Sequence, residues 1–473
     1  MDIWWQKIKR LLLVVGIIVA AMLAIVTIVN RVLTRQPTFA LRNNCLTDRS
    51  ASTVRNAFRN DKKTNVCYYV IEEVKTSTHR PFHTERRNSM RERTMNRALI
   101  IGGGIGGLCA AIALRQVGMD VTVFERVTEM NEVGAGLTLW TNAVRALQKL
   151  GLTDALQAIG TPYTRATIYS CQGEILSETP VDALLKKFQI ASIGVHRADL
   201  QAILLSTLGE GVVQRGAQCT GFTQNETGVC ASFADGKEAW GDVLIGADGI
   251  HSVIRSQLFG LARPRYAGYT AWRGVTPFQV EQIGDAFETW GRGKRFGFVP
   301  LDQGRVYWFA TRNMPEGRGD GKMGRKCEVL DLFRGWHEPI EALIQATEES
   351  AILHNDIYDQ KPLHHWGEGH ITLLGDAAHP MTPNMGQGAC QAIEDTLVLA
   401  ACLRNARNME AALRAYEKER IKRTAAIIRR SRTIGRVAQW ESPLVCSIRN
   451  AILKRTPSDA LLKQLEWVLE YQA

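Results

Sequence analysis

The segment LIIGGGIGGLCAAIALRQVGMDVTVFER, residues 99–126, restricts the possible folds of this chain more than any other part. It begins with an apolar run of the kind that forms a buried parallel strand. A stretch with helical spacing follows the glycines and ends at Gly118, and a second apolar run comes after it. This order predicts a strand, a helix and a strand, which together require a parallel sheet covered by helices.

The spacing of the glycines indicates what this unit binds. Gly102, Gly104 and Gly107 form G-x-G-x-x-G between strand and helix, and Glu125 ends the second strand. The first glycine permits a tight turn, the second lets backbone approach a pyrophosphate, and the third lets the helix pack closely. Glu125 is placed to bind an adenosine ribose. The alternative is a glycine-rich packing turn, but the position between strand and helix favours a dinucleotide.

Other segments carry weaker signals when they are taken singly. Residues 132–152 read as a turn followed by a helix, VHRADLQAILL places Arg197 at a helix start, and GDVLIGADGIHSVIR places Asp248 in a turn between strand and helix. Each has a plain alternative: Arg197 is then a solvated arginine, and Asp248 is the N-cap of a helix that begins near His251.

A second glycine cluster stands in GDAAHPMTPNMGQGACQAIEDT, residues 375–396. Gly386 and Gly388 precede a predicted helix start, and the carboxylates Glu394 and Asp395 follow them. Glycines at such a place indicate that the backbone approaches another group.

The positive charge of the chain lies in its N-terminal part. The net charge is +11, and residues 1–94 carry 17 Lys and Arg against 7 Asp and Glu, which leaves +1 for the rest. No nucleic-acid partner is therefore expected, because the main body has no basic face and no nucleic-acid-binding motif. The ten cysteines are scattered without zinc spacing, which favours reduced thiols and no metal site. The adjacent His364 and His365 lie on a strand-like segment that points their rings to opposite faces.

The N-terminus contains an apolar run, LLLVVGIIVAAMLAIVTIV, from Leu11 to Val29. Its length matches the roughly 20 residues of a membrane-spanning helix. The flank that follows is the more basic one, which places the main body in the cytoplasm. The sequence thus predicts a single-pass membrane anchor. It leaves open whether residues 1–94 are a tether or whether Met95 is the true start.

From residue 96 to about 430 the chain resembles the FAD-dependent aromatic-ring hydroxylases, which include salicylate and urate hydroxylases and zeaxanthin epoxidases. The resemblance rests on the first glycine motif, on Gly-Ala-Asp-Gly at residues 246–249, and on Gly375-Asp376 followed by PNMGQGACQAIED. Many relatives have Asn in place of Cys390. The cysteine variant resembles the sequences of the urate hydroxylase and zeaxanthin epoxidase branches.

The resemblance implies that the two glycine clusters hold the two ends of one FAD, with Asp376 at the ribityl chain and residues 386–390 along the isoalloxazine and pyrophosphate. His379 and Pro380 either line the flavin or shape the loop. The implied cofactor contacts are Gly102, Gly104, Gly106, Gly107, Glu125, Arg126, Thr138, Arg197, Cys219, Asp248, Asp376, Gly386, Gln387, Gly388, Ala389 and Cys390.

Three segments between the cofactor motifs alternate apolar and polar residues with period two, within residues 263–280, 293–312 and 351–360. They predict antiparallel strands of a sheet that roofs the flavin and carries Trp272, Phe296, Phe298, Tyr307 and Trp308. The resemblance to urate hydroxylases implies a substrate role for Arg295 and Tyr307. The alternative for both is ordinary placement on the strand surface.

The predicted fold is an α/β protein: a Rossmann-like FAD-binding domain with an inserted mixed β-sheet substrate domain, plus one N-terminal transmembrane helix. The predicted divisions are an anchor at 1–30, a basic linker at 31–94, an FAD-binding domain at 95–265 and 366–435, a substrate sheet at 266–365, and C-terminal helices at 436–473. The basic helical stretch from residue 409 is expected to be a solvated cover.

The resemblance implies a monooxygenase that uses NAD(P)H as a transient co-substrate and O₂ to hydroxylate or epoxidise a small aromatic, heterocyclic or unsaturated substrate through a flavin C4a-hydroperoxide. The sequence does not identify the substrate, the preferred nicotinamide or the oligomeric state. Two alternatives stay open at this point: a reductase or halogenase on the same scaffold, and a membrane flavoprotein without catalytic activity.

Overall fold

The computed structural model of the chain describes residues 96–130, 135–278 and 285–473. The predicted membrane anchor and basic linker lie outside these residues. Within the described ranges no helix combines the length and the apolar character needed to cross a membrane.

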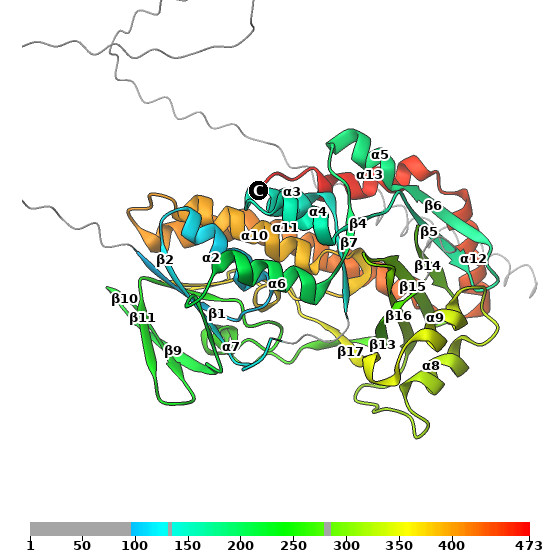
Figure 1. The fold of residues 1–473 in the computed structure, drawn as a ribbon, viewed down its shortest axis with the longest axis horizontal. Coiled ribbons are helices and arrows are strands. Elements are labelled where there is room, and N and C mark those ends of the chain that lie inside the picture. Colours follow the sequence, from blue (N-terminus) through cyan, green and yellow to red (C-terminus); the bar gives the residue numbers. More distant parts are fainter. Residues whose placement is uncertain (1–95, 131–134, 279–284) are drawn as a thin grey trace, which may run out of the picture. The chain divides into compact units, whose positions relative to one another are not determined.

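A five-stranded sheet forms the first layer, in the order β18-β12-β1-β2-β8, and every neighbouring pair in it is parallel. The strand, helix and strand unit predicted from the glycine motif is confirmed as β1 (Arg97–Ile101), α2 (Ile105–Gln116) and β2 (Asp120–Glu125). The other strands are β8 (Val213–Arg215), β12 (Val243–Gly246) and β18 (Ile371–Leu373). Helices α2, α6 (Arg197–Leu208) and α10 (Gly388–Leu403) pack together beside the sheet (Figure 1).

Two small sheets complete this part of the molecule. One has the order β11-β10-β9, with β9 at Cys219–Asn225, β10 at Gly228–Phe233 and β11 at Glu238–Gly241. The other has the order β3-β7-β4, with β3 at Gly136–Leu139, β4 at Thr161–Pro162 and β7 at Ile193–His196. The prediction of a turn and a helix over residues 132–152 missed β3, which precedes α3 (Thr141–Lys149). Strand β3 has only four residues and pairs with the distant strand β7, so its sequence shows too short an alternation to predict a strand.

A seven-stranded mixed sheet forms the second large layer, in the order β17-β13-β16-β15-β14-β5-β6. The antiparallel strands predicted from period two are confirmed as β13 (Arg265–Pro277), β15 (Lys294–Pro300), β16 (Arg305–Asn313) and β17 (Leu353–Asp359). The sheet also contains β14 (Ala286–Trp290), β5 (Arg165–Ser170) and β6 (Ile175–Pro180). The predicted boundary at residue 265 is therefore wrong for β5 and β6, because β5 pairs in parallel with β14 from the other segment.

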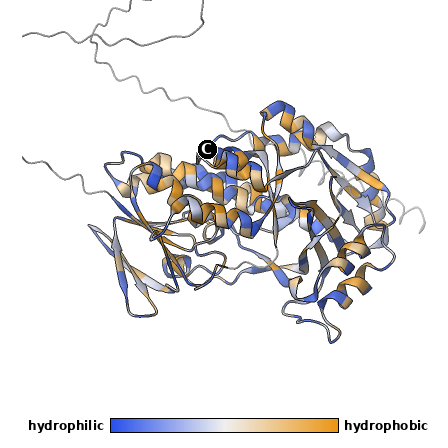
Figure 2. Cartoon of the chain, viewed as in Figure 1, coloured by the Kyte–Doolittle hydropathy of each residue, from blue (hydrophilic) through white to orange (hydrophobic). Residues whose placement is uncertain are grey.

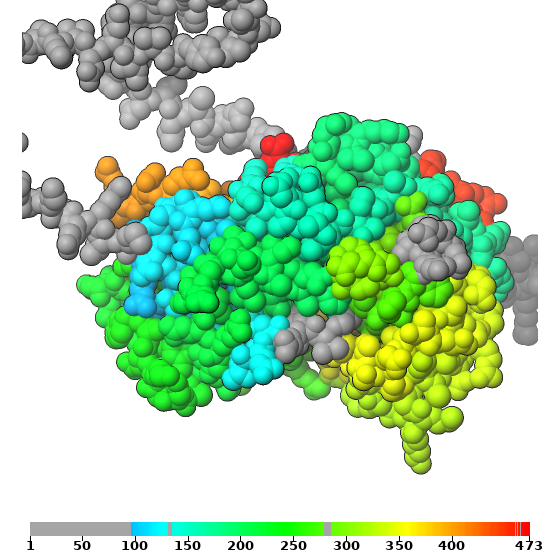
Figure 3. All heavy atoms as spheres, in the orientation of Figure 1, coloured from blue at the N-terminus to red at the C-terminus, as the bar shows by residue number. Residues whose placement is uncertain are grey.

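The two faces of this sheet separate the aromatic residues that were predicted to roof the flavin. Trp272, Phe296, Phe298 and Trp308 belong to one core that packs beneath α8 (Arg325–Phe333) and α9 (Ile340–Ala346). These two helices form an outer surface at one end of the space-filling view, in the yellow-green to yellow colours (Figure 3). Tyr307 belongs to a different cluster on the opposite face. This second face packs against strand β3, because a Cβ at Gly136 would lie 2.4 Å from Tyr307.

The C-terminal helices are α11 (Met409–Ala438), α12 (Pro443–Arg455) and α13 (Ser458–Leu469). The predicted domain boundary at residue 435 falls inside α11. The expectation of a solvated cover is wrong for part of α11, because Arg420 and Arg423 are buried. Figure 2 shows hydrophilic residues interspersed with apolar ones along α10 and α11. The remaining helices are α4 (Thr153–Ile159), α5 (Val181–Phe188) and α7 (Val253–Phe259).

Candidate active site

The carboxyl ends of three parallel strands bring the three sequence motifs together. The Ala247 N–H donates to the carbonyl of Ile101 at 2.8 Å, and the Leu374 N–H donates to the carbonyl of Gly246 at 2.9 Å. The turn at Gly102 is so close to the second motif that a Cβ there would lie 2.4 Å from the Ala247 carbonyl oxygen. Ligands of open α/β sheets bind at this edge. Strand β18, which leads into Gly375-Asp376, therefore lies in the same parallel sheet as the first glycine motif.

The first glycine loop leaves open space before the start of α2. Gly104 is the N-cap of this helix and makes no side-chain capping bond, and no atom lies within 4 Å of the place where its Cβ would be. Gly106 and Gly107 have a different role, because a Cβ at these positions would lie 2.9 Å from the Leu374 side chain and 2.0 Å from the Gly102 carbonyl oxygen, respectively. Backbone N–H groups at the helix start are thus available to an anion, while the last two glycines serve close packing.

Glu125 is held beside this loop by backbone hydrogen bonds. Its Oε2 accepts from the Gly103 N–H at 2.6 Å and its Oε1 from the Val127 N–H at 3.0 Å. The side chain is half-buried, whereas its neighbour Arg126 is exposed. A carboxylate offers about four acceptor positions, so Glu125 retains capacity for ligand hydroxyl groups.

Asp248 caps helix α7 and keeps one oxygen free of partners among the described residues. Its Oδ2 accepts from Val253 at 2.7 Å and from Ile254 at 3.3 Å, while Ser252 is the N-cap. The helix therefore begins two residues later than the predicted start near His251. Burial raises the pKa of Asp248, and Oδ1 has no hydrogen-bond partner in the described part of the chain. Asp248 can therefore cap the helix through Oδ2 and still bind a ligand through Oδ1.

Two other predicted contacts lie close to these groups. Cys219 begins β9, its Sγ donates to the Gly221 carbonyl at 3.4 Å, and burial raises the pKa of its thiol to about 11. Thr138 of β3 accepts the Cys390 thiol through its carbonyl at 3.7 Å, and its Cβ would lie 3.9 Å from a Cβ at Gly386. Thr138 thus borders the second glycine cluster.

Asp376 lies where the end of β18 meets the start of α10. A Cβ at Gly388 would lie 4.0 Å from its Oδ1. The side chain is accessible to water although protein encloses it on several sides, and burial raises its pKa against the opposing charges of His379, Arg197 and Arg255. An accessible carboxylate in such surroundings suits a ligand that brings hydroxyl donors. Arg197, at the first position of α6, is brought to the same place.

The second glycine cluster presents another uncapped helix start. Gly386 adopts a left-handed conformation with φ of 58°, Gln387 is the N-cap without a side-chain capping bond, and α10 begins at Gly388. The first bond within the helix is donated by Gln391 to the Gln387 carbonyl at 2.8 Å. The N–H groups of residues 388–390 therefore precede the helical ladder and are oriented for an electron-rich partner.

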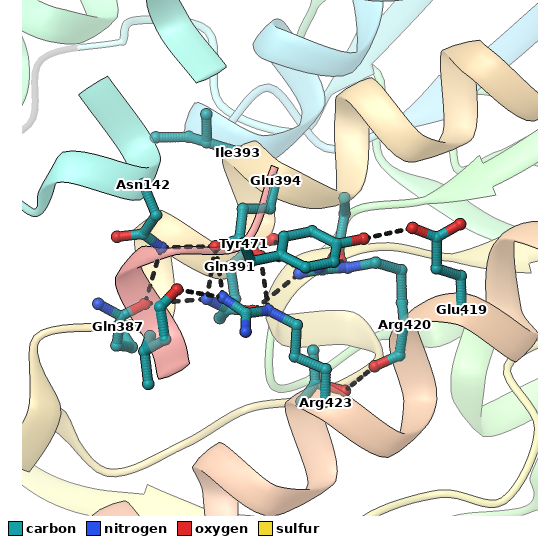
Figure 4. Close-up of polar contacts among 12 residues, drawn as sticks. Asn142, Gln387, Gln391, Ile393, Glu394, Glu419, Arg420, Arg423 and Tyr471 are labelled. Carbon is teal, nitrogen blue, oxygen red and sulfur yellow. Dashed lines mark hydrogen bonds and ion pairs between the residues drawn. The ribbon is translucent and has the colours of Figure 1, made fainter. Parts of the chain in front are cut away.

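The side chain of Gln387 is directed into the protein. Its Oε1 accepts from Asn142 at 3.1 Å and from Gln391 at 2.9 Å (Figure 4). Asn142 also donates to Glu394 at 2.5 Å. The predicted cofactor contact at Gln387 can thus involve only its backbone. The thiol of Cys390 is likewise buried, and burial raises its pKa to about 12.

Beneath this loop lies a buried network of four charged side chains, which the sequence reading missed. Arg420 donates to Asp395 at 2.7 Å. It also donates to Glu394 at 2.7 Å, and Arg423 donates to both oxygens of Glu394 at 2.9 Å (Figure 4). Burial acts to raise the pKa of each carboxylate, but the guanidinium groups, and His379 beside Asp395, hold it below its ordinary value. The sequence did contain a signal for this network, because Glu394 and Asp395 stand within the apolar stretch ACQAIEDTLVLAACL. Carboxylates on a buried helix need charged partners, which predicts arginines nearby.

Arg295 is buried and its guanidinium is occupied by protein partners. It donates to Glu288 at 2.9 Å, to Asn384 at 2.8 Å and to Gln439 at 3.2 Å. Asn384 belongs to the turn η4 (Pro383–Met385) that leads into the second glycine cluster. Arg295 therefore reaches the cofactor side of the molecule, and Glu288 offsets its charge.

Tyr307 lies on the same face of the sheet as Arg295 but not next to it. Arg295 pairs with Thr311 and Tyr307 pairs with Val299, so the two residues are four positions apart along neighbouring strands. At about 3.3 Å per residue and about 4.8 Å between strands, this is roughly 14 Å between backbones. The ring of Tyr307 packs on β3, where a Cβ at Gly136 would lie 2.4 Å from it. Arg295 and Tyr307 thus share one face of the large sheet, but the structure does not bring their backbones together.

The residues at the strand edge fit FAD. The free oxygen of Asp248, the accessible carboxylate of Asp376 and the open space before Gly104 supply acceptors for hydroxyl groups and donors for phosphates. These groups are complementary to the hydroxyl and phosphate groups of a flavin dinucleotide.

Comparison with known proteins gives matches over most of the chain. A family model described as FAD binding domain matches residues 95–431. Aurachin C monooxygenase/isomerase of Stigmatella aurantiaca is 42% identical over 362 residues, which cover 76% of this chain and 94% of that protein. FAD-dependent urate hydroxylase of Klebsiella pneumoniae subsp. pneumoniae is 36% identical over 340 residues, which cover 71% of this chain and 88% of that protein.

The fold is also similar to a solved structure with ligands. The crystal structure of Klebsiella pneumoniae HpxO complexed with FAD and uric acid matches with a TM-score of 0.76 and 31% sequence identity. The match covers 79% of this chain and 97% of that chain.

Proposed function

This chain belongs to the family of FAD-dependent monooxygenases, and from that premise we propose that it inserts one oxygen atom of O₂ into a small, flat, electron-rich ring. The enzyme is an oxidoreductase that uses FAD, with NAD(P)H as co-substrate. The observation that carries the choice of a ring substrate is the position of Tyr307, on the sheet face directed toward the second glycine cluster.

The chain's own residues hold the cofactor and shape its surroundings. The N–H groups at the starts of α2 and α10 would bind the electron-rich parts of FAD, and Glu125, Asp248 and Asp376 would accept its hydroxyl groups. Bound FAD supplies the redox chemistry that activates O₂ after reduction by NAD(P)H. The task of the protein is to orient the ring and to exclude water, so that the activated oxygen reacts with the substrate.

Arg295 and Tyr307 are the proposed residues on the substrate side. Tyr307 offers a phenolic O–H whose pKa is raised by burial, so it remains a hydrogen-bond donor at neutral pH. Arg295 acts through its bond to Asn384, which fixes η4 beside the cofactor loop. Tyr307 is therefore proposed to orient the ring, and Arg295 to position the loop against which the ring lies.

Labelled oxygen tests the proposed reaction. The FAD-loaded protein, supplied with NAD(P)H and ¹⁸O₂, is offered urate, salicylate and other hydroxylated rings. We expect an accepted ring to accelerate NAD(P)H oxidation and to gain one labelled atom. Product without label, or oxidation that no ring accelerates, would refute the proposal.

Variants test the two site residues. Tyr307→Phe is expected to lower substrate-stimulated turnover about 10- to 100-fold while the flavin spectrum stays unchanged, because only a hydrogen bond is lost. For Arg295, the double variant Arg295→Gln with Glu288→Gln avoids leaving the half-buried carboxylate of Glu288 unpaired. Parent-like turnover in both variants would remove these residues from the site.

The proposed location is the cytoplasmic side of a membrane, with residues 11–29 as the anchor. The proposal rests on the length of this apolar segment and on its basic flank. A chain that begins at Met95 should stay in the supernatant and retain FAD, whereas the full chain should sediment with membranes and require detergent. Equal fractionation of the two chains would argue against an anchor.

A further inference from the structure

A second arginine stands on the sheet face that carries Tyr307. In β13, Tyr269 and Ala271 share one face with Arg273, because side chains alternate along a strand. The hydroxyl of Tyr269 donates to the side chain of Asn384 at 3.2 Å. This face of β13 is therefore directed toward η4 and the cofactor loop, while Trp272 is directed away from it into the opposite core.

Arg273 lies close to Tyr307 in the register of the sheet. It pairs with Phe309 of β16, and Tyr307 is two residues further along the same strand. With about 4.8 Å between strands and about 3.3 Å per residue, the backbones of Arg273 and Tyr307 are roughly 8 Å apart. Arg273 also lowers the pKa of Tyr307 against the larger effect of burial. It is thus nearer to Tyr307 than Arg295 is.

Arg273 differs from other arginines of this sheet in its partners. Arg265 binds Asp359 at 3.0 Å, Arg295 binds Glu288 at 2.9 Å, and Arg305 binds Asp199 at 2.6 Å. The side chain of Arg273 is half-buried and has no hydrogen bond or ion pair to any residue that the structure describes. Because this face of β13 is directed toward the cofactor loop, the guanidinium of Arg273 is available to a ligand that supplies a negative charge.

We propose that Arg273 is a specificity-determining residue that binds an ionised oxygen of the ring substrate, so that the enzyme prefers enolate, phenolate or carboxylate rings over neutral ones of the same shape. The inference rests on the proposed function. A planar guanidinium donates two parallel hydrogen bonds to such an oxygen pair, and Tyr307 donates to the same ring. Glu288 already offsets the charge of Arg295, whereas the guanidinium of Arg273 has no carboxylate partner among the described residues.

The chain offers a matched control in Arg312. Its side chain is also half-buried and also lacks a hydrogen bond or ion pair to a described residue. It lies on β16, but it pairs with Lys294 and shares its face with Trp308, which packs beneath α8 and α9. Arg312→Gln therefore removes the same charge from the opposite face.

Ligand titrations of the FAD-loaded full chain test the proposal through the change in flavin absorbance. The probes are two matched pairs, urate against neutral 1,3,7,9-tetramethylurate and salicylate against salicylamide, at pH 7. We expect the parent to bind the anion of at least one pair more tightly than its neutral analogue. In Arg273→Gln the Kd of that anion should rise about 10- to 100-fold while the Kd of the neutral ring stays constant, as for loss of a charge-assisted bond. Arg273→Lys should restore part of the preference, and Arg312→Gln should behave as the parent.

Three results would overturn the proposal: no anion bound preferentially by the parent, an unchanged preference in Arg273→Gln, or equal losses for both members of a pair. These results are independent of the proposed reaction, which fails instead if no ring accelerates NAD(P)H oxidation. Anion binding without turnover would thus support Arg273 while refuting the monooxygenase proposal.

Discussion

The Nε2 atom of His379 lies 2.6 Å from Oδ2 of Asp395, and both side chains are buried. The same carboxylate accepts the N–H of Gly375 at 3.1 Å and a hydrogen bond from Arg420 at 2.7 Å. The pair therefore joins the Gly-Asp turn to helices α10 and α11. Because Asp376 follows directly in that turn, the buried charges fix the position of a residue on the cofactor side.

Replacing Asp395 by Asn should destabilise the protein and change its response to acid. Burial acts to raise the pKa of Asp395, but His379 and Arg420 more than offset it and hold the pKa below its ordinary value. Its contribution is then present above about pH 4 and is lost as the pH falls through the lower folded pKa. We expect Asp395→Asn to lose about 3–5 kcal/mol of unfolding free energy at pH 7 and to show a weaker decline below pH 4.

Urea unfolding from pH 3 to pH 7 measures both effects, and the exposed Asp154 of α4 provides the control through Asp154→Asn. If Asp395→Asn matched the control at pH 7, the buried network would have no net stabilising role.

Replacing Glu125 by Ala should weaken FAD binding. Glu125 is fixed beside the first glycine loop by the Gly103 N–H, and the variant would lose the ribose contact that the sequence predicts for this carboxylate. The expected cost is about 1.5–3 kcal/mol, as for a hydrogen bond to a charged group. Flavin fluorescence titration of the apoprotein measures it, with Asp120→Ala at the exposed start of β2 as control. An unchanged affinity in Glu125→Ala would contradict the assignment.

Replacing Gly136 by Ala should displace Tyr307. The added Cβ would lie 2.4 Å from both Cβ and Cγ of Tyr307, so the ring or strand β3 must shift. We expect a loss of about 1–3 kcal/mol in unfolding free energy, together with lower turnover and retained FAD. Gly319→Ala is the control, because no atom lies within 4 Å of its added Cβ. Parent-like turnover and stability would show that this contact is dispensable.

Cys390 should resist alkylation in the folded protein although it stands in the cofactor loop. Burial raises the pKa of its thiol to about 12, so almost no thiolate is present at pH 8. Iodoacetamide should instead modify Cys327, which is exposed. Mass spectrometry of peptides from the native protein measures this order, and unfolding in urea should make Cys390 react. Early labelling of Cys390 in the native state would mean that the loop opens.

The sequence by itself determined the parts of the site that depend on local backbone chemistry. The turn at Gly102, the left-handed Gly386 and the helix starts at residues 105 and 388 are set by a few neighbouring residues, because glycine permits these conformations and helix starts leave N–H groups unpaired. The alternation in residues 263–280, 293–312 and 351–360 similarly predicted four of the seven strands of the large sheet.

Only the tertiary structure decided which side chains face one another. Strands β5 and β6 joined the large sheet through pairing with β14, more than a hundred residues away in the chain. The same holds for Asn142, which bonds to Glu394 across 252 positions, and for Arg295, which bonds to Gln439 across 144. Such contacts follow from the register between distant strands and from helix packing, and period-two patterns do not encode them. The resemblance implied a substrate role for both Arg295 and Tyr307, and only the register of the sheet shows that Arg273 lies nearer to Tyr307 than Arg295 does.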